Sequence, residues 1–182
     1  SLQLKNKIMG LTEQKETNAK LNNLKTGGYT GLVKITGAQL GVSGAAYATG
    51  DVLGDLSPIQ IEVVRGKNGT AILHSLIIQD LSKQSVAIDM VIFDSNPTAT
   101  TFTDNSALDI ADADLPKVIG VVSVLTGEYA AFNDSSVATK SGISLPIQNI
   151  ASSTFVWVCF VSRGAPTYVA DELSAVIGLL QD

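Results

Sequence analysis

Short runs of β-branched and other apolar residues, separated by turn residues, follow one another from residue 29 to the end of the chain. We expect strands at 31–37, 59–65, 70–80, 86–93, 117–125, 142–150, 154–162 and 173–180. Helical stretches of about 10 to 15 residues do not intervene, which favours an antiparallel sandwich over a parallel sheet. About eight strands in two sheets is typical of a jelly roll. The sequence therefore predicts an all-β protein, an antiparallel β-sandwich of jelly-roll type.

An immunoglobulin-like sandwich is the close alternative to the jelly roll. Immunoglobulin domains carry a Cys…Trp…Cys signature, whereas Cys159 is the single cysteine of this chain. A single cysteine also excludes an internal disulfide, so the fold has to depend on its core. A chain of 182 residues is long enough for one such domain. We expect the sandwich to span 29–182 and to follow an N-terminal arm, residues 1–28.

An Asn-Gly pair lies between two of the predicted strands, 59–65 and 70–80. Asn68-Gly69 favours a type I′ turn, because both central residues of that turn need a positive φ. We therefore expect 59–80 to form a hairpin.

Two later runs differ in how their apolar residues alternate. In 86–93, alternate residues from Val86 to Ile92 fall on one face and Asp89 interrupts the other, which predicts a half-buried strand. In 154–162 both faces are apolar, which predicts a central strand.

One short helix is expected in the connection between 86–93 and 117–125. Capping residues occupy 103–106, the segment from Ala107 to Ala113 follows, and Pro116 would end the helix. At about two turns, such a helix would be a connector and not a layer of the fold.

The arm differs from the rest of the chain in charge. Five lysines and two glutamates give residues 1–26 a net charge of +3, whereas seven basic and fifteen acidic side chains give the remainder −8. A basic segment attached to an acidic body can dock on another copy of that body, and a solvated terminus is the alternative. The residues that we expect to form the interface are Leu2, Leu4, Lys5, Lys7, Ile8, Met9 and Leu11.

The residues that enzymes use for nucleophilic catalysis are few and isolated. His74 is the single histidine and lies inside a predicted strand on the face of Ile72, Leu76 and Ile78, so we expect it to be buried or half-buried. Cys159 lies among apolar neighbours, which disfavour a thiolate and predict a core residue. We therefore expect no catalytic residue and no enzyme activity.

Metal, cofactor and nucleic-acid sites also lack their usual residues. Asp104, Asp109, Asp112 and Asp114 crowd one connection, but their spacing lacks the core and the closing Glu of a calcium loop. Helix capping and loop solvation explain the same residues, and glycine-rich phosphate loops are missing. The acidic body and an arm without arginine disfavour nucleic acid as a partner. We expect no metal and no cofactor.

A membrane or a sugar-cleaving role is not expected either. No apolar run approaches the roughly 20 residues that span a bilayer, and no signal segment opens the chain. Glycosidases use a pair of carboxylates, and their clefts usually carry exposed aromatic residues. This chain has only five glutamates, two of them in the arm, and one tryptophan, which disfavours a glycosidase.

Several segments of the chain carry a family resemblance. These segments are IDMVIFDSNP at 88–97, TFTDN at 101–105, LDIADADLPK at 108–117, VSRGAPTY at 161–168 and GLLQD at 178–182. They resemble a group of small virion proteins of tailed bacteriophages. The similarity covers roughly residues 45–182 and leaves the arm uncovered.

The resemblance implies a structural component of the virion, a head decoration or auxiliary protein with a jelly-roll domain. Its expected partners are the major capsid protein lattice and further copies of itself, as a homotrimer. It would be made in the host cytoplasm and located on the capsid surface.

Two other functions stay open at this point. One is a carbohydrate- or receptor-binding module of a fibre or tail, since jelly rolls also occur in lectins. Its candidate binding residues are Tyr29, Tyr47, Tyr129 and Tyr168. The other is a small viral shell protein built from a single jelly roll.

Overall fold

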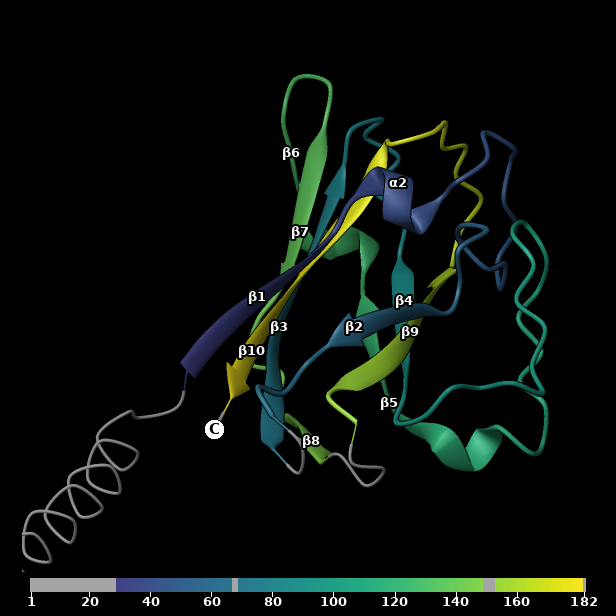
Figure 1. Cartoon of the computed structure of the whole chain (residues 1–182). Coiled ribbons are helices and arrows are strands. Elements are labelled where there is room, and N and C mark those ends of the chain that lie inside the picture. Colours follow the sequence, from purple (N-terminus) through teal and green to yellow (C-terminus); the bar gives the residue numbers. More distant parts are fainter. Residues whose placement is uncertain (1–28, 67–68, 149–152, 182) are drawn as a thin grey trace, which may run out of the picture.

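Two antiparallel β-sheets pack face to face in the computed structural model, which describes residues 29–66, 69–148 and 153–181 (Figure 1). The six-stranded sheet contains β1 (Tyr29–Ile35), β3 (Thr70–Asp80), β6 (Tyr129–Ala131), β7 (Ser136–Lys140), β8 (Leu145–Gln148) and β10 (Leu173–Gln181). The four-stranded sheet contains β2 (Ile59–Glu62), β4 (Ile88–Phe93), β5 (Val118–Val124) and β9 (Phe155–Ser162). Each of the eight predicted runs overlaps a strand, although β1 begins two residues before the run 31–37, and the predicted all-β sandwich is confirmed.

The strand order identifies the sandwich as a jelly roll. The order is β1-β10-β3-β7-β6 in one sheet, with β8 also paired to β3, and β2-β9-β4-β5 in the other. The first strand thus pairs with the last, the second with the next to last, β3 with β7 and β8, and β4 with β5. Because these pairs alternate between the sheets, the chain is a long hairpin wound around itself, which is the jelly-roll path.

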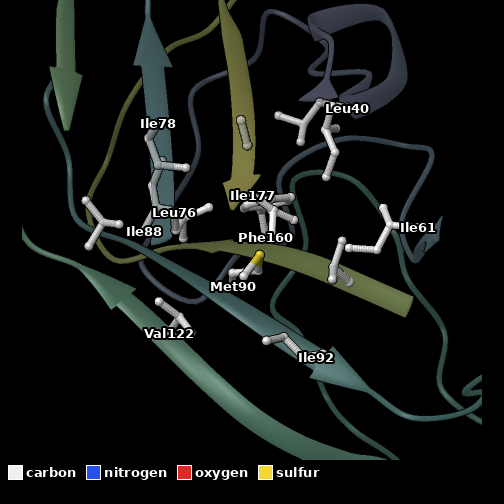
Figure 2. Packing of buried hydrophobic residues seen from close by; sticks show 14 of the residues in the cluster. Leu40, Ile61, Leu76, Ile78, Ile88, Met90, Ile92, Val122, Phe160 and Ile177 are labelled. Carbon is white, nitrogen blue, oxygen red and sulfur yellow. The ribbon is translucent and has the colours of Figure 1, made fainter. Parts of the chain in front are cut away.

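Side chains that alternate along the strands fill the space between the two sheets. Figure 2 shows Leu76 and Ile177 of the six-stranded sheet in one cluster with Met90 and Phe160 of the four-stranded sheet. None of these four side chains is more than 1% exposed. Burial of each contributes about 1.5–3 kcal/mol relative to an exposed position. This cluster is the main source of stability.

Strand β4 is buried on both faces. Alternate residues from Ile88 to Ile92 face the core, as predicted, but Val91 and Phe93 on the other face are only 4% and 0% exposed. The prediction of a half-buried strand is therefore wrong. The connection from β4 to the next helix covers this second face, and the ring of Phe102 meets Phe93 edge-on with centroids 6.0 Å apart.

Strands β2 and β3 do not form the predicted hairpin. β2 pairs with β9, whereas β3 lies in the other sheet beside β10, β7 and β8. The Gly69 amide donates to the Gly66 carbonyl at 3.0 Å, so the chain does turn here, but the turn carries it between sheets. Long-range strand pairing outweighs the local preference of Asn68-Gly69, and Asn68 itself lies outside the described residues.

The buried face of β3 switches near His74. Burial falls on odd-numbered residues up to Leu73 and on even-numbered residues from Leu76 onward. A register shift in the pairing with β10 marks the irregularity. Such a bulge moves the following side chains to the opposite face. His74 is consequently exposed, and the prediction that it is buried on the face of Leu76 is wrong.

Residues 103–113 form no helix, contrary to the prediction. The described helices are α2 (Gly37–Leu40), η1 (Leu115–Lys117) and η2 (Thr126–Glu128), and Pro116 lies inside η1 instead of ending a helix. Asp104, expected to be a cap, accepts hydrogen bonds from distant segments. Its tertiary contacts outweigh its capping preference. Within the described ranges, no helix has the length and apolar character needed to cross a membrane.

Candidate binding groove

An open apolar groove lies on the outer face of the four-stranded sheet. Its volume is about 320 Å³, and its floor contains Val91 of β4, Val121 of β5 and Val161 of β9. Val121 lies directly across from Val91 in the β4–β5 register. Val91 is 4% exposed and Val121 is 53% exposed. The groove therefore runs from the covered middle of the sheet to its edge strand, β5.

Residues 94–114, here called the connector, form one wall of the groove. Ala107, Leu108 and Ile110 of the connector line it, and Leu115 and Val118 close the end near η1. Leu115 is 58% exposed. Ordered connections of this length inside a compact domain are usually functional, and clustered exposed apolar side chains mark interaction surfaces. The groove has both properties.

Charged groups surround the apolar floor. At one end the Arg163 Nε donates to the Asp89 Oδ2 at 2.6 Å. The connector carries five aspartates and no basic residue. Asp109 and Asp112 are exposed on the connector but are not among the residues that line the groove, whose charged lining residue is the paired Arg163. An occupant with apolar side chains would match the groove, and basic side chains beside them would match the acidic connector.

Buried Asp114 holds the end of the connector in place. Its Oδ2 accepts hydrogen bonds from the amides of Ala99 and Thr100 at 2.8 and 2.6 Å, and the Lys117 Nζ lies 2.7 Å from its Oδ1. Burial by itself raises the pKa of Asp114, but Lys117 and the donors of Thr100 and Ala99 outweigh it and lower that pKa from 3.8 to about 2. The charged carboxylate thus ties residues 99–100 to η1.

Replacement of Asp114 by asparagine is expected to make stability less sensitive to acid. Because the folded pKa is depressed, the carboxylate stabilises the fold above about pH 4, and this contribution is lost as the pH falls towards about 2. The free energy of unfolding of Asp114→Asn should therefore lie furthest below the wild-type value at neutral pH and converge with it in acid. Urea unfolding from pH 7 to pH 2 measures this difference.

The exposed Asp112 provides the matched control for this comparison. Asp112→Asn should follow the wild-type curve at every pH. A constant gap between Asp114→Asn and wild type across the whole range would contradict the role given to the Asp114 carboxylate.

Asp104 anchors the other part of the connector. Its Oδ1 accepts hydrogen bonds from the Tyr47 hydroxyl at 2.8 Å and from the Gly54 amide at 2.7 Å. Burial raises the pKa of Tyr47 to about 12, so the hydroxyl keeps the proton that it donates. Backbone bonds between Val52 and residues 105–106 add to this contact. The connector is therefore held in its middle by Asp104 and at its C-terminal end by Asp114, and it presents a preformed wall.

The four clustered aspartates do not converge on one point. Asp104 and Asp114 each have their own protein donors, and Asp109 and Asp112 are exposed. Among the residues that the structure describes, no group of three or more histidine, cysteine or acidic side chains could hold a metal ion.

The other residues singled out from the sequence lie away from the groove or outside the structure. Tyr47 and Tyr168 are 2% and 0% exposed, so neither offers the exposed ring expected of a sugar-binding tyrosine. Cys159 is 0% exposed, as predicted for a core residue, and burial raises the pKa of its thiol to about 12. In the described part of the chain, no hydrogen bond joins the His74 ring to a carboxylate or a hydroxyl.

The predicted interface residues of the arm, from Leu2 to Leu11, lie outside the described residues. The groove itself was not predicted. One signal in the sequence pointed to it, since Val118 to Leu125 is an apolar run without charge that the fold places at a sheet edge.

A second hollow, of about 470 Å³, lies where β1 and β10 pass the end of β2. Leu32, Val64, Arg65 and Gln181 are among its lining residues. Its lining comes from chain segments that end at the limits of the described ranges, so we assign no site there.

Comparison with known proteins adds no name to this site. No protein-family model matches the sequence, and no curated protein is similar to it. The fold and the groove, together with the resemblance of the segments around it, are therefore the observations from which a function can be inferred.

Proposed function

We propose that the protein is a structural component of a bacteriophage virion, a capsid decoration or auxiliary protein. In this role it binds the capsid lattice and neighbouring copies of itself. One observation carries the proposal. Three of the five segments that resemble phage virion proteins contribute residues to the groove, namely 88–97 with Val91, 108–117 with Leu108, Ile110 and Leu115, and 161–168 with Val161 and Arg163. Of the other two, 101–105 lies in the connector and Gly178 to Gln181 lie in β10 of the other sheet.

The edge strand beside the groove supports an assembly role. β5 reads Val-Ile-Gly-Val-Val-Ser-Val and carries no charge and no proline, although it pairs only with β4 in its sheet. A register shift marks an irregularity between Val118 and Gly120, and the pairing from Gly120 to Val124 is regular. Exposed apolar edges favour contact with other chains unless charges, prolines or bulges protect them. Symmetric assembly is one way to cover such an edge.

The remaining chemistry of the described residues favours binding over catalysis. The exposed His74 and the buried Cys159 have no partners arranged for nucleophilic attack among the described side chains. Jelly rolls host many functions, so the groove, and not the fold, supports the proposal.

The proposal is tested on particles released from cells that carry the gene. We expect mass spectrometry of purified particles to find the protein in many copies, and immunogold electron microscopy to label the head. Label confined to the tail tip would favour the receptor-binding alternative. Absence of the protein from purified particles would overturn a structural role in the virion.

A further inference from the structure

We infer that the groove is the docking site for residues 2–11 of a second copy of the chain. This inference deepens the proposed function and rests on it, because a lattice-binding protein that also binds its own copies needs a surface for that contact. The occupant is part of the arm, and its acceptor is the groove between β5 and the connector.

The size and polarity of the groove fit a short apolar segment. A volume of about 320 Å³ is at the lower end of the roughly 300–1,000 Å³ of binding pockets, so the groove accepts a few side chains and not a domain. Residues 2–11 supply apolar side chains that a single chain end has little means to bury against itself. These side chains are Leu2, Leu4, Ile8, Met9 and Leu11.

The charges on the two partners are opposite. Lys5 and Lys7 lie among the apolar residues of the segment, and 2–11 contains no acidic residue. The connector that forms one wall of the groove carries Asp109 and Asp112, which are exposed beside the groove and do not line it. Exposed ion pairs contribute little to affinity, so the apolar contacts supply most of it and the charges favour this segment over an acidic one.

The position of β1 favours a second copy over the same chain. β1 is an edge strand of the six-stranded sheet, and its first residue, Tyr29, pairs with Gln181. The groove opens on the outer face of the other sheet, and Figure 1 shows the start of β1 and the connector on opposite sides of the sandwich. Residues 12–28 span at most about 60 Å when extended and would have to pass around the whole sandwich. A neighbouring copy needs no such detour.

Photo-crosslinking of the full chain tests the inference. Benzoylphenylalanine replaces Val121 on the groove floor, and ¹⁴N- and ¹⁵N-labelled chains are mixed before irradiation. We expect mass spectrometry to find position 121 joined to a peptide from residues 2–11, with pairs of mixed isotope that identify two copies.

Two matched controls accompany the experiment. Val169 has the same side chain and the same 53% exposure as Val121 but lies outside the groove, so a probe at 169 should not capture residues 2–11. Leu4→Asp should lower the yield at position 121 by at least about tenfold, whereas Leu24→Asp, beyond the docked segment, should leave it unchanged.

Each other outcome has a defined meaning. Capture of same-isotope pairs alone, of another segment, or of nothing would overturn docking of a second copy's arm. Because the crosslink needs only purified protein, its failure is distinct from absence of the protein from virions, which would instead overturn the proposed function.

Discussion

Replacement of Asp80 by alanine is expected to lower the free energy of unfolding by about 3–5 kcal/mol, because it removes the acceptor at the centre of a buried polar network. Asp80 ends β3 and is 0% exposed. Its Oδ2 accepts from the Ser85 amide at 2.7 Å and lies 3.5 Å from the Tyr168 hydroxyl. Its Oδ1 accepts from the Ser82 amide at 3.1 Å.

These hydrogen bonds hold a strained turn. Lys83 and Ser85 adopt positive φ values of 54° and 50°, which non-glycine residues rarely do. The Asp80 carboxylate accepts from the amides on either side of Lys83 and so stabilises this conformation. Without it, the half-buried amides of the turn and the buried Tyr168 hydroxyl lose their partner, and each such loss at a buried group costs about 1–3 kcal/mol.

Guanidinium unfolding of wild type, Asp80→Ala and Asp80→Asn measures the effect. Asp80→Asn keeps one acceptor oxygen and should lose about half as much stability as the alanine variant. Asp134 is exposed in the β6–β7 loop, and Asp134→Ala should unfold like wild type. A loss below about 1 kcal/mol for Asp80→Ala would show that the network contributes little to stability.

Replacement of Gly54 by alanine is expected to cost about 3–5 kcal/mol, for two separate reasons. Gly54 has a φ of 92°, in the region that favours glycine. A methyl group there would also overlap the backbone carbonyl of Leu40, which cannot move without displacing α2. The Gly54 amide further donates to Asp104, so the substitution should loosen the connector as well.

Gly50 separates these two effects. Its φ is 100°, but a methyl group added there would meet no atom within 4 Å. Gly50→Ala should therefore cost only the backbone strain, about 1–2 kcal/mol. Thermal unfolding should show a clearly larger drop in Tm for Gly54→Ala, at about 2–4 °C per kcal/mol for a domain of this size. Equal losses at the two positions would contradict the overlap with Leu40.

Alternating apolar residues predicted the strands, because burial between two sheets demands a period of two. The run 154–162 does not alternate, because both of its faces are apolar, and this predicted the central strand that β9 forms between β2 and β4. The jelly-roll type was also predictable, from the number of strands and the absence of helices between them.

Features that depend on contacts between distant segments were not predictable. Asn68-Gly69 suggested a hairpin, but β2 pairs with β9, more than 90 residues further along, and β3 pairs with β7, β8 and β10 in the other sheet. The short hairpin of β6 and β7 was missed because Tyr129 to Ala131 is too brief to show a period. The exposure of His74 depends on a bulge in the pairing of β3 with β10. The conformation around Asp104 depends on its hydrogen bond with Tyr47, fifty-seven residues away.

The groove could not be predicted from the sequence, because it depends on strand residues and on the conformation of the connector that covers them. Val91 and Val161 were predicted to lie in strands, but the connector was predicted to form a short helix with solvated aspartates. Its real conformation depends on Asp104 and Asp114 finding donors elsewhere in the fold. Local sequence patterns therefore predicted the strands of the sandwich but not the groove on its outer face.

The copy number of groove variants in virions tests the central claim most directly. A phage that lacks the gene is supplied with wild type, Val121→Asp or Val169→Asp, and copies per particle are counted by quantitative mass spectrometry. Both valines are 53% exposed, so both variants should fold. We predict that Val169→Asp enters particles like wild type and that Val121→Asp falls by at least about tenfold. Equal incorporation of Val121→Asp would contradict the claim that this protein binds through its groove.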